Sequence, residues 1–336
     1  MGQSPDSDSY NDNEDGIPFF QGNADFGEKY PTTRKWCNAP TKIAHAEDIL
    51  ISVRAPIGAL NYAKEECCIG RGLAAITPNQ DKVSSGFIYW LLKGKHKELN
   101  LQGTGSTFKA ISRKVLEEIK VPDIELKKQT ELAGSLEKVY SVIQLRKQQL
   151  EELDILIKAR FVEMFGDPIQ NEKNWSRRSL EQLCHSIVDC PHSTPNYISE
   201  DTGFMCIRTS VVKKNKILWD EIEYIVEDEF NQRIQRKRPE KGDIVYTREG
   251  AILGIAAIID RNCNVALGQR SMLLSPDSSV CTSEFICTAM NSDSFLSNAL
   301  RGISGSASPH INVGDIKSFE MIAPPLELQR KFSEFN

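Results

Sequence analysis

Residues 126–165 read LKKQTELAGSLEKVYSVIQLRKQQLEELDILIKARFVEMF, and this stretch determines how the rest of the chain is organised. Its apolar side chains recur at steps of four and three residues, which keeps them on one narrow stripe of a helix. Glu, Lys and Gln fill most other positions and favour helix, and Gly166-Asp167-Pro168 follows as a stop. A helix of roughly forty residues extends about 60 Å. The sequence therefore predicts one long helix that separates two other parts of the chain, with an ordinary core helix as the alternative.

The apolar stripe of this helix predicts a contact with another helix or with a partner protein. One expected apolar place is filled by Arg146. The residues of the stripe are Leu132, Leu136, Val139, Ile143, Leu150, Leu153 and Ile157. An exposed apolar seam is unfavourable in water and tends to be covered. Self-association through this helix is therefore one expected consequence.

The composition is that of an ordinary globular protein. The 336 residues are 40% hydrophobic and 26% charged, and a chain of this length can form two domains with separate cores. No apolar run of about 18 residues and no basic-then-apolar leader occur, so we expect neither a membrane span nor export and interpret the protein as cytoplasmic. The nine cysteines form no CxxC pair, which indicates reduced thiols rather than a disulfide framework.

Charge is segregated along the chain, although the formal net charge is only -5. The first 28 residues contain acids and no Lys or Arg, whereas basic residues cluster at 109–114, 208–216 and 233–241. A phosphate-binding face requires such segregation. Solvated surface remains the alternative for any one of these clusters.

The chain contains two copies of one unit. Four segments of the first half recur in order in the second: Asp48-Ile-Leu-Ile-Ser as Asp243-Ile-Val-Tyr-Thr, residues 68–78 as 266–276, Thr104-Gly-Ser and Ile111 as Ser304-Gly-Ser and Ile311, and residues 121–126 as 323–328. The offsets lie between 195 (243 − 48) and 202 (323 − 121). Chance does not give four matches in one order, so the repeat is genuine.

Each copy predicts the same order of elements. Short Val/Ile/Leu runs bounded by Gly and Pro predict strands, at 49–53 and 73–76 in the first copy and at 244–246 and 272–274 in the second. A predicted helix follows each pair of strands, at 85–92 and at 283–290, and a Gly/Ser turn comes after it.

These elements predict an α+β fold with two similar globular domains separated by a long coiled-coil-type helix. The expected boundaries are 1–122 for the first domain, 123–166 for the spacer helix, 167–325 for the second domain and 326–336 for the start of a second spacer helix. Residues 175–183 have no partner before Met1. We therefore expect the N-terminal edge of the first domain and most of the second spacer helix to be missing, in a fragment or in the product of a split or rearranged gene.

Several motifs together resemble one known family. They are Gly2-Gln-Ser-Pro, Gly16-Ile-Pro-Phe-Phe-Gln-Gly22, Asp48-Ile-Leu-Ile-Ser-Val-Arg-Ala-Pro-Ile-Gly58, Gly103-Thr-Gly-Ser-Thr-Phe-Lys-Ala-Ile-Ser112 and Arg160-Phe-Val-Glu-Met-Phe-Gly-Asp-Pro168. In this order, and in a two-copy chain, they resemble the DNA specificity subunit of a type I restriction-modification system. The resemblance implies two target recognition domains held apart by paired helices, each reading half of a split site in double-stranded DNA. It also implies methylation subunits docked on the helices and a restriction subunit that joins them.

The sequence lacks the motifs of a nuclease or methylase. No Asn/Asp-Pro-Pro-aromatic tetrapeptide and no Gly-x-x-x-x-Gly-Lys-Ser/Thr occur, and residues 122–127 set their two acids too close together for a metal-dependent nuclease. We expect a non-catalytic subunit with no cofactor of its own, and S-adenosylmethionine, ATP and Mg²⁺ in the partner subunits. Cys184, His185, Cys190 and His192 lack the spacing of a zinc knuckle, so no metal is predicted.

The candidate DNA contacts lie beside the predicted strands and the Gly/Ser turns. Arg54 and Arg248 follow matching strands, and Arg71 and Arg270 follow the next glycine. The turns can offer backbone amides to a phosphate. The full set of candidates is Arg54, Arg71, Ser106, Thr107, Lys109, Arg113, Arg208, Arg248, Arg270, Ser306 and His310. A surface or salt-bridged role is the alternative for each of them.

Two other classes of function remain open at this point. The first is a helical assembly scaffold or regulator whose domains no longer bind DNA, and the second is a standalone nuclease or methylase. One sequence does not disclose the target bases, the gap between half-sites or the stoichiometry.

Overall fold

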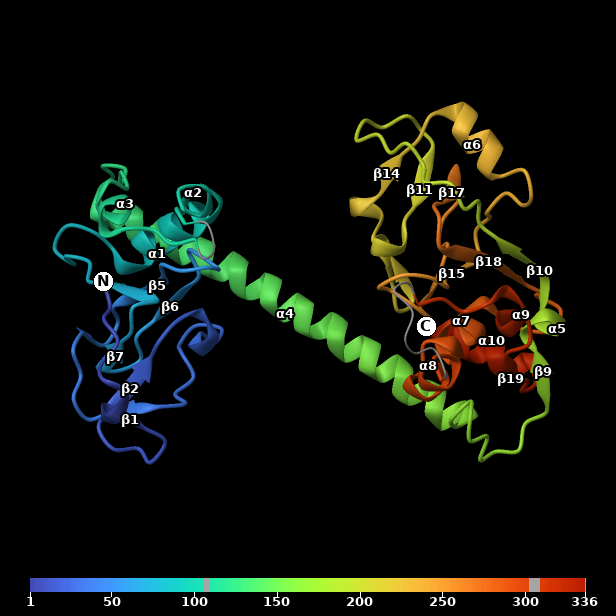
Figure 1. Ribbon diagram of the computed structural model, residues 1–336, viewed down its shortest axis with the longest axis horizontal. Helices are drawn as coiled ribbons and strands as arrows, with labels where there is room; N and C mark the ends of the chain where they lie inside the picture. The colour runs from blue at the N-terminus through green and yellow to red at the C-terminus, as the bar shows by residue number, and fades with distance from the viewer. Residues whose placement is uncertain (106–108, 302–308, 336) are drawn as a thin grey trace. The chain divides into compact units, whose positions relative to one another are not determined.

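The computed structural model describes residues 1–105, 109–301 and 309–335 (Figure 1). The chain divides into two compact units, Met1–Lys147 and Gln148–Asn336, which we call unit 1 and unit 2. The helix α4 (Leu126–Phe165) crosses this division and has the predicted bounds. Its end is set by Gly166, whose φ of 77° lies in the left-handed region that glycine adopts without strain.

Unit 1 combines a mixed sheet, an antiparallel sheet and short helices. Its strands are β1 (Tyr10–Asn11), β2 (Ile17–Phe20), β3 (Trp36–Cys37), β4 (Ile43–Ala44), β5 (Ile49–Ser52), β6 (Leu60–Tyr62), β7 (Cys67–Ile69) and β8 (Leu73–Ile76). Its helices are η1 (Ser7–Ser9), η2 (Asn23–Asp25), α1 (Ser85–Gly94), α2 (His96–Leu101) and α3 (Arg113–Glu117). The strand orders are β1-β3-β2-β7-β4 and β6-β5-β8. The α-helices lie at the β5 and β6 end of the unit, and β1, β2 and β7 lie at the other end (Figure 1).

Unit 2 has the same plan with additional elements. Its strands are β9 (Arg177–Ser179), β10 (Cys184–Asp189), β11 (Met205–Ile207), β12 (Val212–Lys213), β13 (Lys216–Ile217), β14 (Glu223–Tyr224), β15 (Ile244–Thr247), β16 (Ala256–Ile258), β17 (Val265–Leu267), β18 (Ser271–Pro276) and β19 (Glu320–Ile322). Its helices are α5 (Leu180–Leu183), η3 (Thr209–Val211), η4 (Trp219–Glu221), α6 (Glu227–Arg233), α7 (Ser283–Met290), α8 (Asp293–Ala299), α9 (Val313–Lys317) and α10 (Leu326–Phe335). The main sheets have the orders β10-β18-β15-β16 and β14-β11-β17.

The central strand of each unit is buried on both faces. In β5, Ile49 and Ile51 pack towards the helices, whereas Leu50 packs against the mixed sheet. In β15, Ile244 and Tyr246 belong to the core that includes α7, and Val245 belongs to the core beneath β11 and β17. A strand covered on both faces is a continuous apolar run rather than an alternating one. That is the pattern from which both strands were predicted.

The pairing around the central strands confirms the internal repeat. β5 pairs antiparallel with β6 and β8, and β15 pairs antiparallel with β16 and β18. β2 runs parallel to β7, as β11 does to β17. The predicted bounds of β8 and α7 are those observed, and the other predicted strands and the α1 helix differ at their ends by one or two residues.

A buried glutamine fixes the start of α4 and of α10 in the same way. Gln129 is 2% exposed, and its side chain accepts from the Ser84 amide at 2.9 Å and donates to the Ile124 carbonyl at 2.7 Å. Gln329 is 1% exposed, and it accepts from Thr282 at 3.0 Å and donates to Pro324 at 2.8 Å. The first turn of α10 therefore repeats the first turn of α4.

This match corrects one register of the predicted repeat. Gln129 and Gln329 lie 200 residues apart (329 − 129), so the pairing of 121–126 with 323–328, at an offset of 202, is two residues out of register. Gln129 and Gln329 determine the register because each side chain is buried and makes the same two hydrogen bonds. The sequence match relied instead on Pro122 and Pro324, and a proline precedes the helix in either register.

Both ends of α4 are anchored by apolar contacts. At its start, Ala133 belongs to the core around α1, and the ring of Tyr140 meets that of Trp90 at 5.4 Å. At its end, Phe161 and Phe165 are buried in the large core of unit 2. Phe332 of α10 packs on both of these rings, at 5.5 and 5.7 Å.

Within the described part of the chain, no helix combines the length and apolar character needed to cross a membrane. The nine cysteines are free thiols. Burial raises the pKa of Cys67, Cys184 and Cys281 to about 12, so these thiols stay protonated at neutral pH.

The buried glutamines should be essential to the docking of their helices. Replacing Gln129 with Ala leaves two partly buried backbone groups, the Ser84 amide and the Ile124 carbonyl, without this partner, at about 1–3 kcal/mol each. We expect Gln129→Ala to lower the free energy of unfolding of unit 1 by about 2 kcal/mol or more, measured by urea denaturation. The control is Lys128→Ala on the exposed surface of α4 within unit 1, where the ion pair with Glu131 contributes under about 0.5 kcal/mol. Equal losses in the two variants would contradict this role.

Candidate nucleic-acid interface

A cleft in unit 1 gathers residues that follow its strands. It has a volume of about 460 Å³ and lies where β2, β5 and β7 end. It is lined by Gln21, Gly22, Asn23, Ala24, Asp25, Arg54, Ala55, Pro56, Arg71 and Gly72. Because β2 and β7 are parallel, their carboxyl ends meet at one edge, which brings Gln21 and Arg71 to the same cleft.

The side chains that line the cleft carry two positive charges, Arg54 and Arg71, and one negative charge, Asp25. Arg54 and Arg71 are exposed, and among the residues that the structure describes neither guanidinium has an ion pair. The one acid of the lining, Asp25, accepts from the amides of Gln21 at 2.7 Å and Gly22 at 3.2 Å. Its charge is therefore used to hold the turn after β2, which leaves the two arginines available to an anion.

Backbone hydrogen bonds hold Arg54 at its place. The amide of Val53 donates to Gly72 at 2.9 Å, the amide of Ile111 donates to Val53 at 2.9 Å, and Ala55 donates to Lys109 at 3.1 Å. The Ser52 hydroxyl donates to the Pro56 carbonyl at 2.6 Å and accepts from Ala59 at 3.0 Å. Residue 54 is therefore fixed by the core rather than carried on a free loop.

Unit 2 repeats these backbone hydrogen bonds, which we call the framework, with other side chains. The Arg248 amide donates to the Arg270 carbonyl at 3.1 Å, and the Arg248 carbonyl accepts from the Ile311 amide at 2.8 Å. Val53 makes the same two backbone hydrogen bonds in unit 1, with Gly72 and Ile111. The bridge between Arg54 and Ala110 is matched by a bridge between Glu249 and His310. Arg54 and Arg248 therefore do not occupy matching places.

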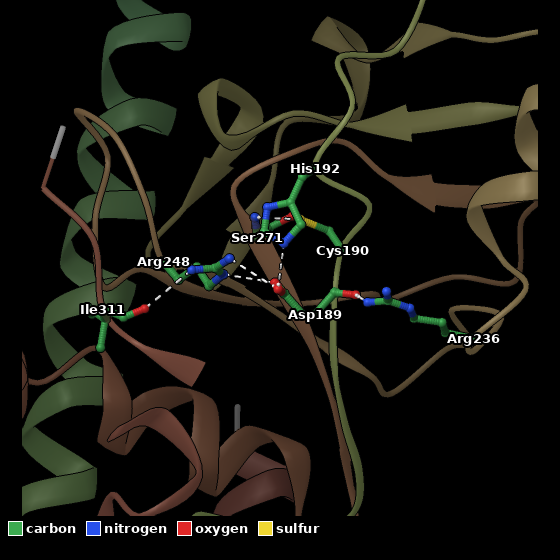
Figure 2. Close-up of polar contacts among 7 residues, drawn as sticks. All are labelled: Asp189, Cys190, His192, Arg236, Arg248, Ser271 and Ile311. Atoms are coloured by element: carbon green, nitrogen blue, oxygen red, sulfur yellow. Dashed lines mark hydrogen bonds and ion pairs between the residues drawn. The ribbon is translucent and has the colours of Figure 1, made fainter. Parts of the chain in front are cut away.

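Arg248 lies inside unit 2 (Figure 2). It is 7% exposed, and its guanidinium donates to both carboxylate oxygens of Asp189, from Nε at 2.8 Å and from a terminal nitrogen at 3.1 Å. The other terminal nitrogen reaches the Ile311 carbonyl at 3.5 Å, and His192 Nε2 lies 3.0 Å from Asp189 Oδ2. This ion pair joins the end of β10 to the end of β15 and to the segment after residue 308. In this arrangement Arg248 positions the framework and does not face solvent.

Three further candidates lie around the same edge of unit 2. Arg208 is exposed, pairs with Glu223 and lies 4.6 Å above the Tyr197 ring, and the hydrogen bond that its guanidinium donates to Glu223 raises the pKa of Arg208. Arg270 is exposed with a φ of 72°, an uncommon conformation for a residue other than glycine, and its side chain lies over Gly250. His310 is exposed beside Glu249.

The remaining candidates are placed less closely together. Lys109 is exposed, and Arg113 is exposed and paired with Glu117 at 2.7 Å. Ser106, Thr107 and Ser306 lie outside the described residues. Arg233, which was counted in a basic cluster, is buried and holds the Ser193 carbonyl at 2.8 Å.

In the described parts of the chain, Cys184, His185, Cys190 and His192 do not converge on one point where a zinc ion could bind. There, no group of three or more His, Cys, Asp or Glu side chains is arranged to hold a metal ion. His185 faces Asp277 at 3.4 Å, whereas His192 faces Asp189. Burial raises the pKa of the Cys190 thiol, which accepts a hydrogen bond from the Ser271 amide at 3.3 Å (Figure 2).

The family model for the type I restriction modification DNA specificity domain matches residues 1–154 and 172–335. The chain belongs to this family. One matched segment covers each copy of the repeat, so the two-domain α+β fold inferred from the sequence is confirmed.

Individual specificity subunits resemble different amounts of the chain. The putative type I restriction enzyme MjaX specificity subunit of Methanocaldococcus jannaschii is 43% identical over 154 residues, which are 46% of this chain and 36% of that protein. The MjaVIII specificity subunit of the same organism is 22% identical over 262 residues, 74% of this chain and 61% of that protein. This chain therefore spans less than two thirds of the length of either relative. The crystal structure of the type I restriction-modification S subunit from M. genitalium matches 99% of this chain and 84% of its own chain. The TM-score is 0.57 at 15% sequence identity, which supports the fold.

Three side chains of the specificity-domain framework were missed by the sequence analysis, namely Gln21, Glu249 and Gln269. Glu249 occupies the place of Arg54, Arg208 follows β11 as Gln21 follows β2, and Gln269 follows the glycine after β17 as Arg71 does after β7. The sequence repeat could have revealed Glu249, because the offset of 195 between Asp48 and Asp243 also relates Arg54 to Glu249 (54 + 195 = 249). The candidates were cationic residues beside the strands and polar residues of the Gly/Ser turns, and this choice left Gln21, Gln269 and Glu249 out.

The pair of Arg248 and Asp189 should contribute strongly to the stability of unit 2. Removing one member of a buried ion pair leaves the other charge uncompensated, which destabilises a protein by several kcal/mol. We expect Arg248→Met to lower the free energy of unfolding by about 3 kcal/mol in urea titrations. The combined variant Arg248→Met with Asp189→Leu should recover part of this loss, because no unpaired charge remains.

The control for this measurement is Lys331→Met, which removes the exposed partner of Glu327 on α10. Exposed helix pairs contribute about 0.3–0.5 kcal/mol. A loss in Arg248→Met no larger than in Lys331→Met would show that the buried pair does not hold the framework.

Proposed function

We propose that this chain is a non-catalytic subunit that gives DNA sequence specificity to a type I restriction-modification complex in the cytoplasm. Each unit would read one half of a two-part target in double-stranded DNA. The main support is the repetition of one framework, which places exposed or half-buried polar and charged side chains at the same strand ends in both units. Membership of the specificity domain family supports the same assignment.

The chemistry of these positions suits base reading. Arginine donates a two-pronged fork to guanine, glutamine pairs with adenine, and glutamate accepts from cytosine, all in the major groove. Arg54, Gln21 and Arg71 meet at one cleft in unit 1. Lys109, Arg113, Arg208, Arg270 and His310 are the further proposed contacts, to bases or to phosphates.

The exposed stripe of α4 is the proposed docking surface for partners. Leu150 is 63% exposed and Val139 is 57% exposed, and Leu132, Leu136, Ile143 and Leu153 are exposed as well. Ile157 differs, because it packs partly against the core of unit 2. Methylation subunits, a second long helix or another copy of the chain would cover this apolar stripe. The methyl donor, ATP, Mg²⁺ and the restriction subunit would belong to the assembled complex.

The proposal predicts selective, salt-dependent binding to a split duplex. A randomised duplex library selected on the purified 336-residue chain should yield two short conserved blocks separated by a fixed unconserved gap. Affinity should fall steeply with salt, because each neutralised phosphate releases counterions. A helical scaffold with degenerate domains would give neither conserved blocks nor a salt slope, and methylation or cleavage by the chain alone would contradict the non-catalytic assignment.

A further inference from the structure

We infer that one framework position, Arg54 in unit 1 and Glu249 in unit 2, reads a base in each half-site, an inference that rests on the proposed function. The backbone equivalence is direct. Each residue lies two positions after a strand hydroxyl, that of Ser52 or Thr247, which accepts an amide hydrogen bond at 3.0 or 2.9 Å. Each also forms the same antiparallel bridge.

Neighbouring positions of the framework show a coordinated exchange of arginines. In unit 1 three of these positions hold Arg54, Arg71 and Gln21. In unit 2 the matching positions hold Glu249, Gln269 and Arg208, in the same order. A fourth place holds Gly72 in unit 1 and Arg270 in unit 2. Each unit therefore carries two arginines on one framework, at different places.

The exchange at the fourth place is constrained by packing. A Cβ atom on Gly72 would lie 2.3 Å from the carbonyl oxygen of Gln21, so unit 1 accepts no side chain there. In unit 2 the Arg270 side chain instead extends over Gly250, the residue after Glu249. The two units thus present different arrangements of donors and acceptors around position 54 or 249.

A carboxylate at this place favours base reading over phosphate binding. Glu249 would be repelled by a phosphate, so on a DNA-facing surface its acceptor oxygens are matched only by base-edge donors such as the amino group of cytosine. Among the residues that the structure describes, neither Glu249 nor Arg54 has an ion pair, so both side chains are available. Arg54 would correspondingly select guanine through its O6 and N7 acceptors.

The test is a selection from a randomised duplex library by the full 336-residue chain, compared with Arg54→Glu and Glu249→Arg. In the wild type, we expect a G·C pair at one position of each half-site, contacted through its guanine by Arg54 and through its cytosine by Glu249. Arg54→Glu should change the preferred base at one position of one half-site, and Glu249→Arg at one position of the other, each by about tenfold or more in relative affinity. Glu249→Gln keeps the side-chain length and Arg54→Gln shortens it; both remove the charge and should weaken the same single preferences.

Charge-matched controls lie away from the framework edge. Lys64→Glu in unit 1 and Glu200→Arg in unit 2 make the same charge changes at exposed residues, and they should shift affinity evenly without altering any base preference. Thermal unfolding of every variant confirms that both units stay folded.

The outcomes separate the two levels of the proposal. If the wild type selects a split motif but all four framework variants keep its base preferences, or change affinity evenly across sequences, the assignment of Arg54 and Glu249 is overturned and the proposed function stands. If the wild type selects no motif, the proposed function fails and this inference fails with it.

Discussion

The structure depends on one strand in each unit that is buried on both faces. Ile49 and Ile51 face the helices and Leu50 faces the other sheet, so a shift of one residue would exchange two cores at once. The register of β5 is therefore strongly specified, and so is the position of each residue that follows it. Arg54 leaves the sheet two residues after the strand ends, at a place determined by burial rather than by loop flexibility.

The same constraint explains how the two units keep one geometry while differing in chemistry. Arg248 and Val53 make the same backbone bonds, although one side chain is an ion-paired guanidinium and the other is apolar. In unit 2 the partner Asp189 comes from β10, a strand with no counterpart in the sheet around β5. An interior side chain can change when a partner is supplied for it, and the residues at the strand ends, which are the proposed reading positions, then remain free to vary.

Much of the fold could be predicted because its signals are local. The bounds of α4 follow from helix-forming residues, an apolar stripe broken at one place by Arg146, and Gly166, and all three are readable in one stretch of sequence. The strands β8 and β15 are apolar runs between turn residues, and the repeat relates the two units without any knowledge of contacts. These features depend on neighbours in the sequence or on simple matching.

The site was only partly predictable because it depends on contacts between distant segments. That Arg248 is buried follows from Asp189, which lies 59 residues earlier, and no local pattern reveals their pairing. The place of Glu249 is defined by its bridge to His310, and the register of α10 by the bonds of Gln329 to residues around 280. The loops between the matched segments differ in length, so the offset changes along the chain, and the sequence match of 121–126 to 323–328 was two residues out of register.

The central claim is that α4 sets the distance between two similar DNA-reading units, and changing its length tests this most directly. Inserting seven residues in the exposed part of α4 after Gln144 adds about 10 Å, roughly the length of three base pairs. A variant in which the seven residues after Gln144 are replaced without a change of length serves as the control. The account predicts that the insertion lengthens the gap between the two selected DNA blocks by about three base pairs and leaves the blocks unchanged. An unchanged gap, or a change in the blocks themselves, would contradict it.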